Sequence, residues 1–267
     1  MNKNILLFLS FLCFHSLKAQ SWISDSIQVD YNVRSIYIDP LSNKYLVSEE
    51  MQIQKYKPDG TFWNRYENNR LGSIGWVDVS NPFMVLVFYP QYQSLVILDN
   101  NMSESGRLNF SSIGFGNVRT AAISDDNNIW ILDEGNRKLT KIKTSGEIVV
   151  DGIPYFGFDI DGSKPIHLLQ KSNFVYISQA GKKVQVFDIF GKWVKSIDLE
   201  GLTFVIYIDK SIFYKDDNKI VEYPIDNLNI EPLKTLPLSG MRSITYDVIR
   251  QRFYGLDPDN KIYYYKL

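Results

Sequence analysis

The chain has 267 residues, of which 14% are aromatic, and its formal net charge is −1 at pH 7. This length can form one β domain with a sizeable core, and a charge near zero disfavours binding to nucleic acid or to an anionic membrane surface. The 17 Tyr and 16 Phe residues, without the Ala/Leu/Glu/Lys patterns of long helices, indicate a protein built from sheets.

The first 19 residues are expected to be a secretory signal peptide. A basic residue, Lys3, precedes an apolar run that ends at Phe14 and is shorter than the ~20 residues a transmembrane helix needs. Cleavage after Ala19 would remove the only cysteine, Cys13, and two lysines, and the net charge would become −3. We therefore expect an exported chain in the periplasm or at the cell surface, without a disulfide or a transmembrane span.

Six copies of one motif follow along the chain, each a strand with an apolar anchor and a second apolar residue three positions later. The anchors are 36 to 45 residues apart, a spacing typical of propeller blades and too long for leucine-rich or ankyrin repeats. An aromatic-rich strand precedes each anchor, and another alternating strand precedes that one. Glycine turns such as "KPDG" (57–60) then lead to an outer strand. The anchors are Ile53, Leu95, Leu139, Val184, Ile220 and Ile262.

We predict an all-β fold in which residues 20–267 form a single six-bladed β-propeller of four-stranded antiparallel blades. The last repeat ends after its third strand, and residues 22–29 are similar to an outer strand. Pairing of this N-terminal strand with the last blade would close the ring and remove its open sheet edges. The scheme makes "DEGNR" (133–137) a turn between the second and third strands of blade 3. Pro90 lacks a backbone donor, so blade 2 is where irregular pairing could arise.

The stretch "NNIWILDEGNRKLTKIKTSGE" (127–147) resembles the NHL-type repeat, in which a strand ends in Asp, a Gly-Asn-Arg turn follows, and an apolar strand leads to a glycine. Blade 3 fits this pattern well, blades 1, 4, 5 and 6 fit it in part, and blade 2 fits it poorly. The resemblance covers almost the whole mature chain and implies the propeller fold. It leaves the function open, because propellers host enzymes, scaffolds and binding modules.

Groups suited to acid–base or nucleophilic catalysis are scarce in this sequence. Outside the predicted leader there is one histidine, His167, in the expected inner strand of blade 4, where a packed or solvent-facing role is favoured over a catalytic one. There is no cysteine nucleophile in the mature chain and no G-x-S-x-G motif. The sequence therefore favours a non-catalytic protein and names no catalytic residue.

Acidic residues gather at the expected turns between second and third strands, which a propeller presents on one face. A six-bladed, metal-dependent lactonase or esterase would hold a calcium-type ion with such oxygens. Asp, Asn and Gly are also the residues that these turns need for their own backbone, and no early Glu-x-Pro motif of the lactonase kind occurs. We expect no cofactor. If calcium is bound, the weak candidates are Glu49, Asp133, Asp216 and Asp257.

Two links between blades, at residues 109–117 and 151–165, are longer than the others and should emerge on the face that carries the acidic turns. Exposed rings beside polar groups are typical of interface anchors. The same rings could equally fold back and cover the ends of blades 3 and 4, and both interpretations stay open. The candidate binding residues are Phe110, Phe115, Tyr155, Phe156 and Phe158.

The expected function is a non-catalytic, protein-binding scaffold in the bacterial cell envelope. The Ala19–Gln20 cleavage context and the Asn/Ile/Lys/Tyr-rich composition resemble envelope proteins of gliding bacteria with type nine secretion. This resemblance suggests a periplasmic subunit of outer-membrane secretion or surface machinery, with a protein partner and no nucleic acid. The alternatives are a metal-dependent propeller lactonase or esterase, and a carbohydrate-binding propeller.

Overall fold

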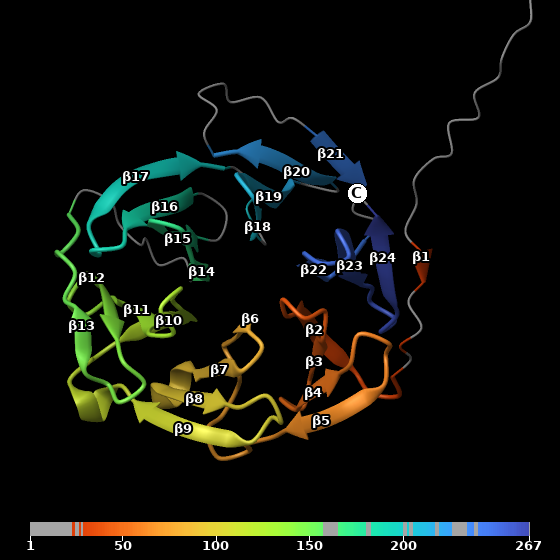
Figure 1. Cartoon of the computed structure of the whole chain (residues 1–267), viewed down its shortest axis with the longest axis horizontal. Helices are drawn as coiled ribbons and strands as arrows, with labels where there is room; N and C mark the ends of the chain where they lie inside the picture. The colour runs from red at the N-terminus through yellow and green to blue at the C-terminus, as the bar shows by residue number, and fades with distance from the viewer. Residues whose placement is uncertain are drawn as a thin grey trace, which may run out of the picture.

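The computed structural model is a ring of six four-stranded sheets arranged around a central axis (Figure 1). It describes residues 23–24, 27, 29–156, 165–179, 183–199, 202, 205–216, 219–225, 234–237 and 240–266. Helical structure in this described part is limited to two 3-10 turns, η1 (Pro90–Tyr92) and η2 (Ser111–Ile113), and no helix there is long and apolar enough to cross a membrane. The predicted all-β, six-bladed propeller is confirmed.

Blades 1 to 5 follow the chain from an inner strand to an outer strand, and the strand pairs are antiparallel. Blade 1 contains β2 (Val33–Ile38), β3 (Lys44–Ser48), β4 (Ile53–Tyr56) and β5 (Phe62–Tyr66), and blade 2 contains β6 (Trp76–Asn81), β7 (Met84–Tyr89), β8 (Ser94–Leu98) and β9 (Glu104–Asn109). Blade 3 contains β10 (Val118–Ile123), β11 (Ile129–Asp133), β12 (Lys138–Ile142) and β13 (Ile148–Val150), and blade 4 contains β14 (Pro165–Lys171), β15 (Phe174–Gln179), β16 (Lys183–Asp188) and β17 (Trp193–Asp198). Blade 5 contains β18 (Val205–Ile208), β19 (Ser211–Asp216), β20 (Lys219–Pro224) and β21 (Lys234–Pro237), and blade 6 contains β22 (Ser243–Asp247), β23 (Arg252–Leu256) and β24 (Ile262–Lys266). All six predicted anchors lie in the third strand of their blade.

The N-terminal strand β1 (Ile23–Ser24) supplies the fourth strand of blade 6. It pairs antiparallel with β24, with Ile23 opposite Tyr264, and the sheet order is β1-β24-β23-β22. Ile27 is buried in a cluster that also contains Val33 of blade 1. The predicted ring closure is confirmed for this paired segment, while Trp22 and residues 1–19 lie outside the described part of the chain.

The turns between second and third strands lie beside the links that lead from one blade to the next. The backbone N–H of Glu49 donates to the Asn32 carbonyl at 2.9 Å, and that of Glu134 donates to the Asn117 carbonyl at 3.0 Å. The turn at 134–137 joins β11 to β12, as predicted. One face of the ring therefore carries both the acidic turns and the links.

Aspartates at strand ends hold several of the turns together. In each case one side-chain oxygen accepts two backbone N–H groups, from the residues two and four positions later. This bonding replaces the strand ladder where the chain reverses, and it explains why turns of this sequence are rich in Asp. The four aspartates are Asp39, Asp99, Asp188 and Asp257.

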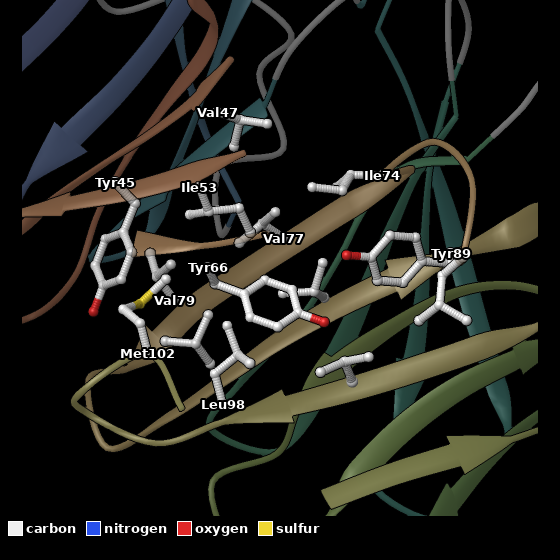
Figure 2. Close-up of a cluster of buried hydrophobic side chains, with 14 residues drawn as sticks. Tyr45, Val47, Ile53, Tyr66, Ile74, Val77, Val79, Tyr89, Leu98 and Met102 are labelled. Atoms are coloured by element: carbon white, nitrogen blue, oxygen red, sulfur yellow. The ribbon is translucent and has the colours of Figure 1, made fainter. Parts of the chain in front are cut away.

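Neighbouring blades pack through apolar side chains that project from both faces of each sheet. Figure 2 shows the cluster between blades 1 and 2, where Tyr45 and Ile53 of blade 1 meet Val77, Tyr89 and Leu98 of blade 2. All five residues of β3 in blade 1 and all five of β8 in blade 2 are buried, because each of these two sheets is covered on both faces. Each fully buried large apolar side chain contributes roughly 1.5–3 kcal/mol, so these clusters dominate the stability of the ring.

Strand pairing in blade 2 is regular at the place where the sequence suggested irregularity. β7 and β8 pair over five consecutive positions without a bulge. Pro90 opens η1 in the turn between them, where its missing N–H needs no partner, and Gln93 ends that turn with a left-handed backbone (φ 47°). The register shifts of this blade lie elsewhere, between Asp78 and Asn81 in the pairing of β6 with β7 and between Ile97 and Leu98 in the pairing of β8 with β9.

Candidate functional sites at the channel mouth and on the rim

The inner strands enclose a cavity of about 400 Å³ on the propeller axis, lined by β2, β6, β14, β18 and β22. A series of rings crosses this region. The centroid of Trp76 lies 5.9 Å from that of Tyr37 and 4.8 Å from that of His167, and His167 stacks on Tyr207 at 5.9 Å. These rings come from blades 1, 2, 4 and 5, so aromatic contacts across the axis join blades that are distant in sequence.

His167 packs within this series of rings. Burial lowers the pKa of its imidazole to about 4, so the ring is neutral at neutral pH. Its Nδ1 has no hydrogen-bond partner among the described residues, and its ring contacts are with Trp76 and Tyr207. A general base is tuned to a pKa near the working pH and is oriented by a partner. The surroundings of His167 are those of a packing residue.

A second cavity, of about 540 Å³, lies on the face of the links, where blades 1, 2 and 3 meet. We call it the mouth cavity. Its volume is within the range of about 300–1,000 Å³ that is common for small-molecule sites. Its described lining contains two arginines and no carboxylate. The polar and aromatic side chains of the lining include Arg34, Trp76, Gln91, Asn117, Arg119 and Thr120.

The two arginines occupy the same position in their blades, as the second residue of the inner strand. The valine before each is buried and the arginine is more exposed, and in both strands the pairing register shifts at the arginine. Such a bulge re-aims the side chain that it contains. Nη1 of Arg34 donates to the carbonyl oxygen of Ile74 at 3.1 Å. Nη1 of Arg119 lies 3.6 Å from Oε2 of Glu134, which also accepts a hydrogen bond from the Asn117 amide at 2.7 Å.

Two further polar groups in the cavity wall lack a hydrogen-bond partner among the described residues. They are the hydroxyl of Thr120, a residue that is only 2% exposed, and the indole N–H of Trp76. Buried polar groups in native proteins nearly always have a partner. Both atoms are buried within the wall, and the two arginines give the cavity its positive charge.

The five binding residues predicted from the sequence differ in their exposure in the structure. Phe110, Phe115 and Tyr155 are buried and belong to the apolar clusters of blades 2 to 4, so these rings fold back over the blade ends. Phe156 is 76% exposed and is the described member that a partner can reach. Phe158 lies outside the described residues.

The predicted metal candidates do not converge in the described part of the chain, where no three His, Cys, Asp or Glu side chains could share an ion. Asp133 is buried and accepts hydrogen bonds from the backbone and the amide of Asn136. Asp257 binds the backbone of its own turn. Glu49 is exposed, and Asp216 is described only by its place at the end of β19.

Exposed apolar side chains occur on the outer edge of blades 3 and 4, and none of them is among the residues singled out from the sequence. The turn after β16 packs on the link after β13 so closely that a Cβ on Gly191 would lie 2.7 Å from the Cα of Gly152. Exposed apolar residues flank this contact along the chain, on β13 and the link at Gly152 and on the turn at Gly191 and β17. We call this group the rim patch: Ile148, Val149, Ile153, Phe190, Trp193 and Val194.

The sequence contains one pattern that corresponds to the mouth cavity and another that corresponds to the rim patch. The pieces "VRS" (33–35) and "VRT" (118–120) repeat an arginine and a hydroxyl residue at equivalent positions of two inner strands. The uncharged run "IVV" (148–150) occupies an outer strand, where neighbouring outer strands carry charged residues. Neither pattern is informative until the blades are placed around the ring.

Comparison with known proteins supports the architecture alone. No protein-family model matches the chain, and no curated protein matches it. A chain in a crystal structure of the mitotic checkpoint complex is similar, with a TM-score of 0.61 at 10% identity over 100% of this chain and 99% of that one. In total 1231 solved chains match, and a fold shared so widely does not identify a function.

Proposed function

We propose that this chain is a non-catalytic, protein-binding scaffold. The observation that carries the proposal is the rim patch, whose six apolar side chains are 37% to 70% exposed. Single exposed apolar residues are common on protein surfaces, whereas a group of them marks an interaction site. The non-catalytic part of the proposal is supported by His167, which is packed among aromatic rings and has a pKa of about 4.

The rim patch has the composition of a protein interface. Trp193 is held in place by a hydrogen bond from its indole to Gln185 at 2.9 Å, while part of its ring stays exposed. A fixed, partly exposed Trp loses little conformational entropy when a partner covers it. Charged residues border the apolar positions along the chain: Glu147 and Asp151 flank β13, and Lys195 follows the two apolar residues that begin β17. An apolar centre with a polar border is the usual anatomy of such surfaces.

We place this scaffold in the bacterial cell envelope, as an NHL-like propeller that is exported by a leader at residues 1–19 to the periplasm or the cell surface. The support for this placement comes from the leader pattern and from the composition, which is similar to that of envelope proteins in gliding bacteria. The proposed partner is a protein subunit of outer-membrane, type nine-like secretion or surface machinery.

The test is affinity purification of the full chain from envelope fractions after mild crosslinking, with a rim variant and a matched control. The rim variant is Phe190→Asp with Val194→Asp. The control is Phe83→Asp with Val248→Asp, two apolar residues that are 66% and 62% exposed at separate turns. We expect the wild type and the control to retain a stoichiometric protein partner and the rim variant to lose it.

Thermal melting of both double variants checks that each is folded. A wild-type chain that elutes alone, or a rim variant that keeps the same partner, contradicts the proposal. Binding to a glycan array in place of any protein also contradicts it, and would support the carbohydrate-binding alternative.

A further inference from the structure

We propose that the mouth cavity binds a carboxylate carried on an apolar or aromatic body. The two sources of this chemistry are a free aryl or alkyl acid and the C-terminal carboxylate of a peptide. The inference does not depend on the rim patch, which lies on the outer edge of the ring. It depends on Arg34 and Arg119, which reach one cavity from different blades.

Arg34 presents an unused pair of donors. Its Nη1 is directed at the carbonyl oxygen of Ile74 at 3.1 Å and at the sulfur of Met51 at 3.5 Å. The opposite edge of the guanidinium, formed by Nε and Nη2, makes no hydrogen bond to the described residues. Two parallel N–H groups on such an edge match the two oxygens of a carboxylate. The contacts of Nη1 also hold the side chain in place before a ligand arrives.

The charge at the mouth matches a single negative ligand. Arg34 forms no ion pair with a described acidic residue. Arg119 forms an ion pair with Glu134, with 3.6 Å between Nη1 and Oε2. Two guanidinium groups and one carboxylate leave a local charge of +1. A carboxylate neutralises this charge, whereas a dianionic phosphate exceeds it.

The rest of the cavity lining indicates that the ligand carries an apolar or aromatic group beside its carboxylate. The cavity of about 540 Å³ is far larger than a carboxylate group. Ile74, Trp76, Phe88 and Pro90 supply apolar surface to its wall. An apolar wall with a few polar groups that fix orientation is the usual composition of a small-molecule site.

The first test is calorimetric titration of the full chain with N-acetylphenylalanine and, as a neutral match of nearly the same shape, N-acetylphenylalaninamide. We expect the acid to bind at least about tenfold more tightly than the amide, because a charge-assisted pair is lost in the amide. Phenylacetate and the peptide Ala-Ala-Phe with a free C-terminus then identify the source, since the tighter binder of the two resembles the natural ligand. Equal binding of acid and amide, tighter binding of phenyl phosphate, or no binding of any probe overturns the proposal.

The second test uses variants with opposite expected effects. Arg34→Gln should weaken binding of N-acetylphenylalanine about tenfold, whereas Glu134→Gln should strengthen it about threefold, because Arg119 loses its competing carboxylate. The amide introduced by the latter substitution still offers an oxygen to the side chain of Asn117. Arg70→Gln is the matched control, since Arg70 is exposed on a link of the same face and is outside the cavity lining.

Thermal melting shows which variants are folded, and the Glu134→Gln result stands by itself if Arg34→Gln is unstable. Weaker or unchanged binding in Glu134→Gln overturns the proposal, as does equal weakening in Arg34→Gln and Arg70→Gln.

Discussion

The side chain of Gln93 bonds both backbone groups of Val118 across the boundary between blades 2 and 3. The Val118 N–H donates to Oε1 at 2.7 Å, and Nε2 donates to the Val118 carbonyl oxygen at 3.1 Å. Asn260 repeats half of this arrangement between blades 6 and 1, where its Oδ1 accepts the N–H of Val33 at 2.9 Å. Each amide side chain satisfies a backbone group at the inner edge of a sheet, where no further strand is available.

These amide contacts also position the mouth cavity. Val33 and Val118 are the residues immediately before Arg34 and Arg119. The bonded backbone of Val33 and Val118 anchors the start of each inner strand, and the register shift that follows in both strands re-aims the next side chain. The turns of one blade therefore orient the arginines of the following blade.

The hydrogen bonds between Gln93 and Val118 are expected to stabilise the folded chain. Replacing Gln93 with Ala leaves the Val118 N–H and carbonyl without these partners, and we expect urea denaturation to show a loss of about 2 kcal/mol in the free energy of unfolding. Gln91→Ala is the control, because the side chain of Gln91 is exposed and makes a single long hydrogen bond of 3.4 Å to Ser73. Its loss should stay within about 0.5 kcal/mol. Equal losses in the two variants would show that the amide contact contributes nothing specific.

Gly152 tests the close packing of the link after β13, which lies against β12 of its own blade and the Gly191 turn of blade 4. A Cβ at this position would overlap the carbonyl oxygen of Leu139, which is a backbone atom and cannot rotate away. We expect Gly152→Ala to lower the free energy of unfolding by about 1–3 kcal/mol, the usual cost of overpacking. The control is Gly116→Ala, where the added Cβ meets nothing within 4 Å, so this variant should be neutral or slightly stabilised. Urea denaturation of both variants provides the comparison, and a neutral Gly152→Ala would rule out the tight contact.

The architecture could be predicted from the sequence because each blade repeats the same physical requirement. Positions such as Leu139 and Ile142 must be apolar to pack between sheets, and the turns between strands must contain residues that bond their own backbone. These requirements recur with the period of a blade, so they are visible without coordinates. The pairing of β1 with the last blade could also be predicted, because the last repeat lacks a fourth strand in the sequence.

The exposure of the link residues could not be predicted in the same way. Phe110 and Phe156 both follow an outer strand, yet Phe110 is fully buried and Phe156 is 76% exposed. The difference depends on the path of each link: the backbone of Phe110 is bonded to Gln93 at 2.8 Å, which draws the ring beneath the turn. The mouth cavity was hidden for a related reason, since Arg34 and Arg119 look like ordinary polar positions of strands until blades 1, 2 and 3 are placed around one cavity.

Closure of the ring can be tested with two isoleucines of the N-terminal segment. Ile27 is 5% exposed and packs against blades 1 and 6, so Ile27→Ala should cost about 2–4 kcal/mol in the free energy of unfolding. Ile23 pairs with β24 through its backbone but is 49% exposed, and Ile23→Ala should cost less than about 1 kcal/mol. Urea denaturation separates the two, and a small effect of Ile27→Ala would mean that the segment adds little to the closed ring.

The lowered pKa of His167 predicts how the free energy of unfolding depends on pH. Its pKa is about 4 in the folded chain, below the value of about 6.5 expected when the chain is unfolded, so acid favours the unfolded state. The stabilisation by the neutral imidazole is complete above pH 6.5 and is lost as the pH falls toward 4. Between pH 7.5 and pH 5 this linkage lowers the free energy of unfolding by about 2 kcal/mol. His167→Phe keeps a ring against Trp76 and Tyr207 but cannot titrate, so it should lose about 2 kcal/mol less than the wild type over that interval. Urea denaturation at both pH values checks this, and parallel losses in the two proteins would show that the imidazole titrates normally.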